Sequence, residues 1–281
     1  MKARYMAWIG AGALLLLLGA AGFCAPAAQG QDKPSLQKDK DKDAKKEGGV
    51  PAPVNKEEEA AYKAYDAAGP GDLAAKAKLG EDFLQKYPES RYRPLVFSTL
   101  TMTYYNAGQI QKMVETGAKD VELTPTDVNI LALLGQIMPR VLSRDPAEAG
   151  KQLTLAEGYA KRAVELTPTI PKPPALTDEG FAAAKNVVLA MAHSGLGLIN
   201  FKRQKFSEAI TELELAVKLD AQPDPVNFFL LGLANENASH FDDAVTAFTK
   251  CAAIPGQLQA NCKAGIADAK KKAETELSAP K

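Results

Sequence analysis

The chain has few of the residue types from which enzyme and metal sites are built. Its 281 residues include three cysteines, two histidines and one tryptophan, and aromatic residues make up 7%. A metal site at His193 or His240 would need further ligands at compatible spacing, and the sequence offers none. Gly-x-Ser-x-Gly, P-loop, dinucleotide-binding and His-Glu-x-x-His motifs do not occur either. We therefore expect no catalytic residue, no metal and no cofactor.

An excess of charge of one sign is missing as well. Lysine and arginine together number 34, aspartate and glutamate also number 34, and the formal net charge is +0. Nucleic-acid binding requires a clustered positive field, so we expect no nucleic-acid partner. Alanine and leucine, in contrast, are abundant, and they favour helices that pack closely. This composition predicts an all-α fold.

Residues 1–30 have the three-part layout of a secretory signal peptide. Lys2 and Arg4 come first, residues 6–22 carry no charge and are largely apolar, and small residues follow. We expect cleavage and export to the periplasm or the cell exterior. The alternative is an inner-membrane anchor formed by residues 6–22, although this run is slightly short for a span of about 20 residues. Membrane contact is expected only through this segment, if it is uncleaved.

Residues 31–54 are predicted to be a disordered linker. Lysine and aspartate alternate at positions 38–43, and a glycine- and proline-rich stretch follows at 48–53. Such a segment has no apolar face whose burial would offset the entropy lost on ordering. We interpret it as a solvated tether.

The last third of the sequence contains an internal repeat with an offset of 35 residues. The matched positions are Leu196-Gly197 with Leu231-Gly232, Phe206 with Phe241, Ala209 with Ala244, and Ala216 with Cys251. Small residues at matched positions are typical of places where two helix backbones approach each other. We therefore expect helices to pack closely at these positions.

This pattern resembles the tetratricopeptide-repeat (TPR) family, whose 34-residue unit is a helix–turn–helix with Leu-Gly in its first helix and small residues in its second. The resemblance implies an α-solenoid over residues 55–258, followed by a capping helix at 259–277. The implied repeats are about 55–92, 94–127, 128–170, 190–223 and 225–258, with inserts at 139–152 and 169–180. The residues expected at the helix crossings are Leu134, Gly135, Leu196, Gly197, Ala209, Ala216, Leu231, Gly232 and Ala244.

Two cysteines remain if the signal peptide, which contains Cys24, is removed. Cys251 falls where a second helix contacts the next helix, and Cys262 falls early in that next helix. An oxidising compartment would permit a disulfide between them that fastens the cap to the array. The alternative is that Cys251 is a small buried residue and Cys262 a free thiol.

In a TPR array the first helices line a concave groove, and this implies a binding surface for a protein or peptide partner. The residues expected to point into the groove are Met102, Tyr105, Ser194, Leu198, Phe201, Phe229, Leu233 and Glu236. Alternatively, these mostly apolar residues pack against neighbouring parts of the array itself.

The function predicted from these features is a non-catalytic scaffold for protein–protein interaction. A second hypothesis is a small-ligand-binding protein or an enzyme that uses the inserts between repeats. A third, narrower hypothesis is an envelope-assembly factor, because the ending Tyr87-Pro88-x-Ser90 resembles repeats of envelope TPR proteins. The sequence does not identify the partner.

Overall fold

The computed structural model describes residues 55–69 and 71–278. The predicted signal peptide, the alternative membrane anchor, Cys24 and the predicted linker lie outside these residues. Within them the regular structure is entirely helical, which confirms the predicted all-α fold.

The helices follow one another along the chain with short connections. They are α2 (Lys56–Ala67), α3 (Leu73–Lys86), α4 (Arg93–Asn106), α5 (Ile110–Leu123), α6 (Val128–Ile137), η2 (Met138–Arg140), α7 (Pro146–Leu166), η3 (Thr167–Thr169), α8 (Asp178–Lys202), α9 (Phe206–Leu219), α10 (Pro225–Asn237), α11 (Phe241–Ala253) and α12 (Gln259–Ser278). Several helices begin at a residue whose side chain accepts hydrogen bonds from the first free backbone amides, as is usual for helix N-caps. These capping residues are Asn55, Asp72, Asp127, Asp145, Thr177 and Asp224.

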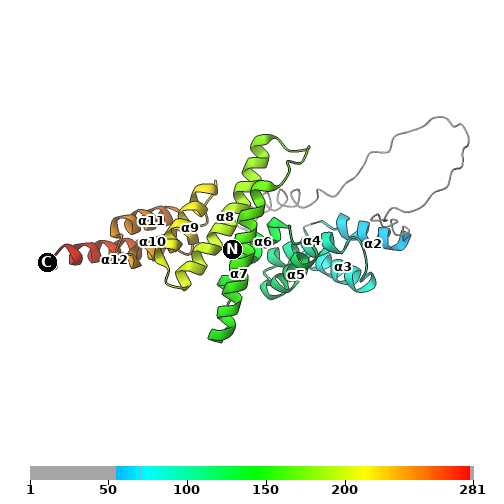
Figure 1. Ribbon diagram of the computed structural model, residues 1–281, viewed down its shortest axis with the longest axis horizontal. Coiled ribbons are helices and arrows are strands. Elements are labelled where there is room, and N and C mark those ends of the chain that lie inside the picture. Colours follow the sequence, from blue (N-terminus) through cyan, green and yellow to red (C-terminus); the bar gives the residue numbers. More distant parts are fainter. Residues whose placement is uncertain (1–54, 70, 279–281) are drawn as a thin grey trace, which may run out of the picture.

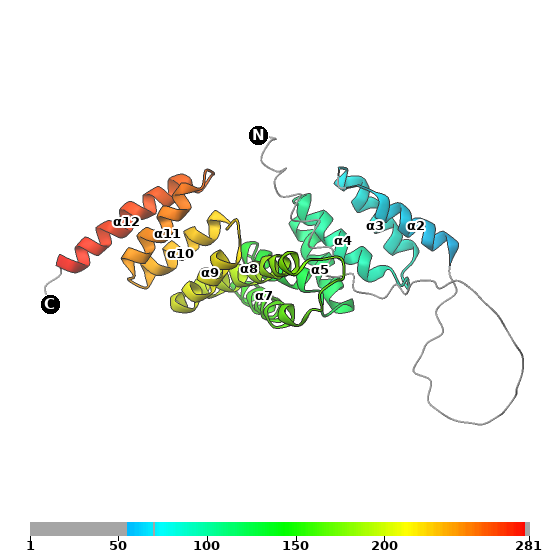
Figure 2. The ribbon, with the colours of Figure 1, turned by 90° about the horizontal axis from the view of Figure 1, so that it is seen from above.

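Consecutive helices pack side by side and form an elongated array (Figure 1). The two longest helices, α7 with 21 residues and α8 with 25, cross the middle of the molecule. Helices α2 to α5 lie on one side of this pair and α9 to α12 on the other (Figure 1). Seen from above, the two arms rise from the central pair, so the array is bent (Figure 2). This sequential packing of helix pairs confirms the predicted α-solenoid.

Three of the turns between paired helices have the same backbone geometry. Each contains one residue with positive φ: Gly108 (69°), Gln204 (59°) and Ser239 (61°). The amide of the following residue then donates to a carbonyl near the end of the first helix. These bonds are Gln109 N to Tyr104 O at 2.9 Å, Lys205 N to Asn200 O at 2.9 Å and His240 N to Asn235 O at 2.8 Å. The shared geometry shows that α4–α5, α8–α9 and α10–α11 are copies of one structural unit.

All nine residues expected at the helix crossings are buried. A Cβ atom placed on Gly197 would lie 2.6 Å from Leu213 Cγ on α9, and one on Gly232 would lie 2.6 Å from the Phe248 ring on α11. No real Cβ tolerates such distances, so only glycine lets these helices approach this closely. The partner of each glycine is thus a large side chain on the second helix, and the small residues Ala209 and Ala244 are buried beside these contacts.

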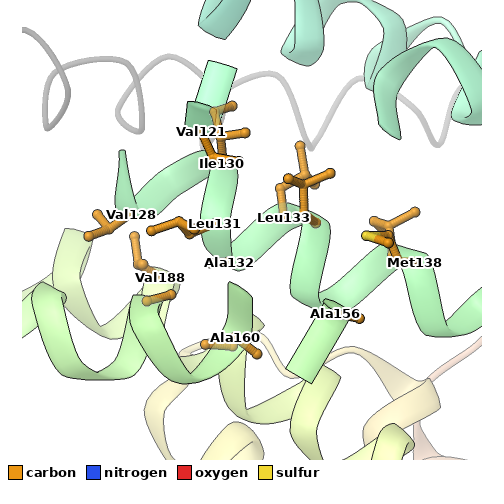
Figure 3. Close-up of a cluster of buried hydrophobic side chains, with 14 of the residues drawn as sticks. Val121, Val128, Ile130, Leu131, Ala132, Leu133, Met138, Ala156, Ala160 and Val188 are labelled. Carbon is orange, nitrogen blue, oxygen red and sulfur yellow. The ribbon is translucent and has the colours of Figure 1, made fainter. Parts of the chain in front are cut away.

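The largest cluster of buried apolar side chains surrounds α6. Every residue of α6 is buried, among them Ile130, Leu131 and Leu134 at 0% exposure. Figure 3 shows side chains of α6 together with Ala160 of α7 and Val188 of α8. A helix that is apolar on all sides is expected to be buried on all sides, and α6 has this composition.

The two inserts expected from the sequence are shorter than predicted. Helix α7 begins at Pro146, so the second half of the segment 139–152 is helical. Helix α8 begins at Asp178 rather than near 190, and the irregular part of the segment 169–180 is reduced to residues 170–177. The reason is that Asp145 and Thr177 cap these helices earlier than the repeat length suggests.

Among the described helices, only α8 has the length and apolar composition that a membrane span requires. Of its most apolar window, 56% is buried within the fold, where it packs against α6, α7 and α9. The composition of α8 is that of a core helix in this solenoid.

Candidate protein-binding surface

The first helices of the repeats, α4, α6, α8 and α10, carry the residues predicted to line the groove. Met102 and Tyr105 lie on α4, and both are half-buried against the cluster around α6. They keep part of their surface exposed. These two side chains are therefore available for contact with another molecule while their position is fixed by the core beneath them.

Leu198 and Phe201 near the end of α8 are also half-buried. The ring of Phe201 packs edge-on against that of Phe206 on α9, with centroids 5.7 Å apart and an angle of 66° between the planes. This contact orients Phe201 without covering it completely. An aromatic ring held in this way loses little conformational entropy when a partner binds.

Ser194 does not have an exposed side chain. It is 2% exposed, and its hydroxyl donates to Asn227 Oδ1 at 2.6 Å. Asn227 belongs to α10 and is itself 2% exposed, so the bond joins two neighbouring repeats inside the fold. Ser194 therefore serves packing between repeats and is not accessible to a partner.

Phe229, Leu233 and Glu236 on α10 each make contacts within the array. Phe229 and Leu233 pack against a cluster that contains Phe248 of α11, and the Phe229 and Phe248 ring centroids lie 5.9 Å apart. Glu236 forms an ion pair with Lys272 of α12, and its side chain is 7% exposed. The terminal helix therefore uses Glu236, while Phe229 and Leu233 remain partly exposed.

A polar cluster formed by Arg140, Asp224 and Tyr105 was not predicted from the sequence. Arg140, in η2, forms an ion pair with Asp224 at 3.5 Å, just before α10. Both charges act on the hydroxyl of Tyr105, whose pKa is raised mainly by burial, with Arg140 opposing and Asp224 adding to the shift. Residues of three separate repeats thus meet here. Arg140 was overlooked because it lies in a segment that was interpreted as an insert. Asp224 could have been recognised as a helix N-cap, because it directly precedes Pro225 and proline is common at the first position of a helix.

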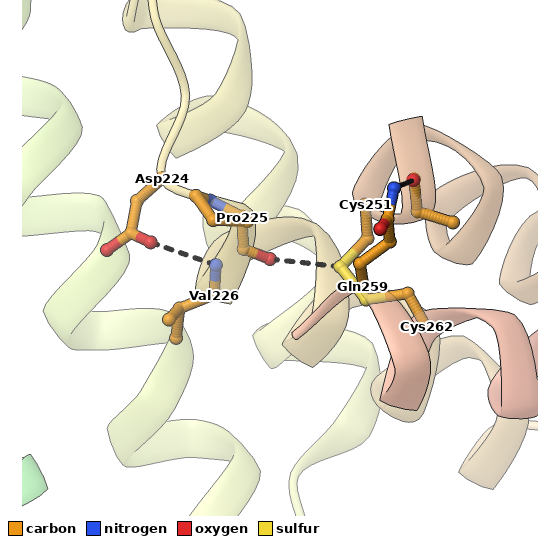
Figure 4. The surroundings of a disulfide bond; sticks show 7 residues. Asp224, Pro225, Val226, Cys251, Gln259 and Cys262 are labelled. Carbon is orange, nitrogen blue, oxygen red and sulfur yellow. Dashed lines mark hydrogen bonds between the residues drawn. A yellow bond between two sulfur atoms is a disulfide. The ribbon is translucent and has the colours of Figure 1, made fainter. Parts of the chain in front are cut away.

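A disulfide joins Cys251 of α11 to Cys262 of α12 (Figure 4). The two Cα atoms lie 5.8 Å apart, and both residues are 0% exposed. Gln259 adds a second tie between the same helices, because its amide donates to the carbonyl of Ala252 at 3.0 Å. The terminal helix is therefore fixed covalently to the last repeat.

The described residues contain no group of three or more histidine, cysteine or acidic side chains arranged to hold a metal. His193 on α8 instead lies 2.6 Å from Glu212 on α9, and His240 is an exposed residue that precedes α11. An open hollow on the outer face of α7 includes the residues Lys151, Thr154, Leu155 and Tyr159. Its side chains form no paired acid and base, and nothing in this hollow singles out a ligand.

The fold type follows from the three turns with the same backbone geometry and from the close helix crossings at Gly197 and Gly232. The chain has a TPR-type solenoid fold. No protein-family model and no curated protein sequence matches this chain. Among solved structures, a thermophilic TPR protein from Thermus thermophilus (TTC0263) is similar at 19% identity with a TM-score of 0.43, covering 75% of this chain and 95% of that one. PilW, described as a widely conserved type IV pilus biogenesis factor, is similar at 17% identity with a TM-score of 0.48, covering 80% of this chain and 93% of that one.

Proposed function

We propose that this TPR-type chain is a non-catalytic scaffold that binds a protein or peptide partner on the inner face of the array. The inner face is defined here by Met102, Tyr105, Leu198 and Phe201. The observation that supports the proposal is that these four side chains remain partly exposed on the first helices, while the core holds Met102 and Tyr105 in place and the ring of Phe206 orients Phe201.

The chemistry of the inner face favours a partner segment with apolar side chains. Two aliphatic and two aromatic side chains offer contacts to a helix or an extended peptide. Tyrosine and arginine are frequent among residues that dominate binding energy, and Tyr105 lies close to Arg140. Because Arg140 is already paired with Asp224, a partner does not need a carboxylate to neutralise it. We therefore infer that apolar contact supplies most of the affinity.

We also propose that the scaffold acts after export from the cytoplasm. The buried disulfide supports this proposal, because disulfides persist in oxidising compartments and are rare in the cytosol. The apolar run at 6–22 after Lys2 and Arg4 supports it independently. The test is whether the protein isolated from the periplasm or medium begins downstream of residue 24; recovery of the full-length chain from the cytoplasm with reduced cysteines would overturn the proposal.

The binding proposal is tested by site-specific photocrosslinking in the native cell. A photoreactive amino acid replaces Met102 or Leu198 on the inner face. The matched control places it at Leu155 of α7, a second helix of the array, where the leucine is 49% exposed. We expect the same protein to be crosslinked from both inner positions and not from position 155. Crosslinks from position 155 alone, or from none of the three positions, would contradict the proposal.

A quantitative test follows once that partner is purified. Glutamate at position 198 places a charge within the apolar contact, and we expect the dissociation constant to rise at least tenfold, which corresponds to about 1.4 kcal/mol. Leu155→Glu makes the same chemical change on α7 and should leave the affinity unchanged. Circular dichroism and thermal denaturation of both variants check that the fold is retained. Equal loss of binding in both variants would place the site outside the inner face.

The alternatives weighed for the sequence remain predictions. A small-ligand or enzymatic function would require convergent polar groups near the irregular segments 141–145 and 170–177, and no observation favours it. An envelope-assembly role was suggested by Tyr87 and Ser90. In the fold, Tyr87 packs on Phe83 with ring centroids 5.2 Å apart, and Ser90 donates to Glu58 of α2. These contacts give the two residues a structural part in the first repeat.

A further inference from the structure

The second helices α5, α7 and α9 end with a shared Val-x-Leu pattern, and α5 differs from the other two in the residue that precedes it. Helix α7 ends with Ala163-Val164-Glu165-Leu166 and α9 with Ala216-Val217-Lys218-Leu219, whereas α5 ends with Asp120-Val121-Glu122-Leu123. Ala163, Ala216 and Asp120 are all 0% exposed. A carboxyl group therefore occupies, in α5, a position that holds a buried methyl group in α7 and α9.

The carboxyl group of Asp120 lies at the joint between α5 and α6. Within the described part of the chain, neither of its oxygens has a hydrogen-bond donor. Burial without a donor strongly disfavours the charged form of a carboxylate. Burial, and after it the negative charge of Asp127, raise the pKa of Asp120 to about 8.

Asp127 faces the same joint from the start of α6. It caps α6, accepting from the amides of Asn129 at 3.0 Å and Ile130 at 3.2 Å. From α4, the hydroxyl of Ser98 donates to its second oxygen at 3.0 Å. The pKa of Asp127 is raised by burial, while these hydrogen bonds oppose the rise.

Among the described residues, the other elements around the joint bring no donor to Asp120 either. Arg162 of α7 is a cation, but it donates its hydrogen bond to the carbonyl of Pro125 in the turn that connects α5 and α6. On α5 itself, Lys119 and Glu122 are exposed to solvent. An ionised Asp120 would therefore be a second negative charge inside the joint, next to Asp127.

We propose that the α5–α6 joint is a proton-dependent hinge of the solenoid, closed while Asp120 carries a proton and loosened when that side chain ionises beside Asp127. Ionisation would draw water into the joint to solvate the carboxylate. The arm formed by α2 to α5 would then move relative to the arm formed by α9 to α12.

The linkage between protonation and folding has a definite sign. The unfolded chain releases this proton near the ordinary value of 3.8, and the folded chain holds it until about pH 8. The contribution of Asp120 to the free energy of unfolding therefore falls as pH rises from about 4 to about 8, and it is constant above that range. Asp120→Ala, which introduces the residue found in α7 and α9, should abolish this dependence.

The hinge is tested by measuring the distance between the two arms. Spin labels are attached through a genetically encoded ketone amino acid at Ala74 of α3 and Glu214 of α9, both exposed, so the native cysteines are untouched. Electron–electron resonance then records the label separation at pH 6 and pH 9.5. We expect the wild-type distribution to broaden or shift at the higher pH, and those of Asp120→Ala and Asp120→Asn to stay as at pH 6.

Asp242→Asn is the matched control, because Asp242 is an exposed acid on α11. This variant should respond to pH as the wild type does. A wild-type distribution that is the same at both pH values would overturn the hinge, and so would equal broadening in Asp120→Ala. If stability changed with pH but the distance did not, Asp120 would be a destabilising group only, and the hinge would again be excluded.

Discussion

Gly195 of α8 lies directly against the backbone of Gly135 in α6. A Cβ atom on Gly195 would be 2.6 Å from the carbonyl carbon of Gly135 and 3.0 Å from the amide nitrogen of Gln136. Neither atom can move without distorting α6, which is buried along its whole length. The approach of these two glycines therefore determines how closely the second half of the array packs on the first.

We predict that Gly195→Ala lowers the free energy of unfolding by about 1–3 kcal/mol, the usual cost of overpacking a core. Gly158→Ala on α7 is the control. Nothing lies within 4 Å of a Cβ at Gly158, so alanine should raise stability by about 0.5–1 kcal/mol through its helix propensity. Urea denaturation followed by circular dichroism measures both values. A neutral effect of Gly195→Ala would show that the crossing relaxes easily.

The repeat itself could be predicted from the sequence because its signals are local. The offset that aligns Gly197 with Gly232 reports contacts between helices that are adjacent in the chain. Gly195 was overlooked because its partner, Gly135, belongs to a helix that is not adjacent to α8 in sequence. A 35-residue period carries no information about which turn of α6 meets which turn of α8.

The groove was harder to predict for a related physical reason. Periodicity indicates which side of a helix a residue occupies, and at the 35-residue offset Phe201 on α8 corresponds to Glu236 on α10. Periodicity does not indicate which side chains of neighbouring helices lie opposite that residue. Phe201 packs against the ring of Phe206, whereas Glu236 pairs with Lys272 of α12. The polar cluster of Arg140 and Asp224 likewise depends on the bend of the array, which results from many contacts together.

The positive φ at Gln204 gives a second prediction. A non-glycine residue in the left-handed region is strained, and the equivalent turn in an earlier repeat uses Gly108. We expect Gln204→Gly to raise the free energy of unfolding by about 0.5–1 kcal/mol, because the relief of strain exceeds the added entropy of the unfolded chain. Gln204→Ala keeps the positive φ and should give no gain. Thermal denaturation of the two variants distinguishes these effects; equal stabilisation would point to the loss of the glutamine side chain.

The disulfide bond between Cys251 and Cys262 gives a third prediction. It closes a loop with a sequence separation of 11, for which chain entropy predicts about 3 kcal/mol of stabilisation. The double variant with alanine at both positions should lose about this amount, mainly in the unfolding of α12. Alanine at 251 matches Ala216 in the preceding repeat, so the packing of α11 is retained. Reduction of the wild type should reproduce the loss, and a wild-type protein that reacts with two equivalents of a thiol reagent before reduction would contradict the prediction.

Glu81 of α3 gives a prediction for acid conditions. It accepts a hydrogen bond from the Tyr104 hydroxyl of α4 and one at 2.9 Å from Lys112 of α5, so it ties three helices together. The Tyr104 bond, followed by that from Lys112, lowers the pKa of Glu81 below its ordinary value of 4.5.

A depressed acid stabilises the fold above its unfolded pKa, and this contribution is lost as pH falls through the folded pKa. Tyr104→Phe should therefore be less stable than the wild type at pH 6 and approach it in acid as Glu81 becomes protonated in both proteins. Because the Glu81 side chain is 47% exposed, we expect a difference below about 1 kcal/mol at pH 6. Guanidinium denaturation between pH 3 and pH 6 measures it. In the Glu81→Gln background the same tyrosine change should show no such pH dependence; if the dependence persisted there, it would belong to another acid.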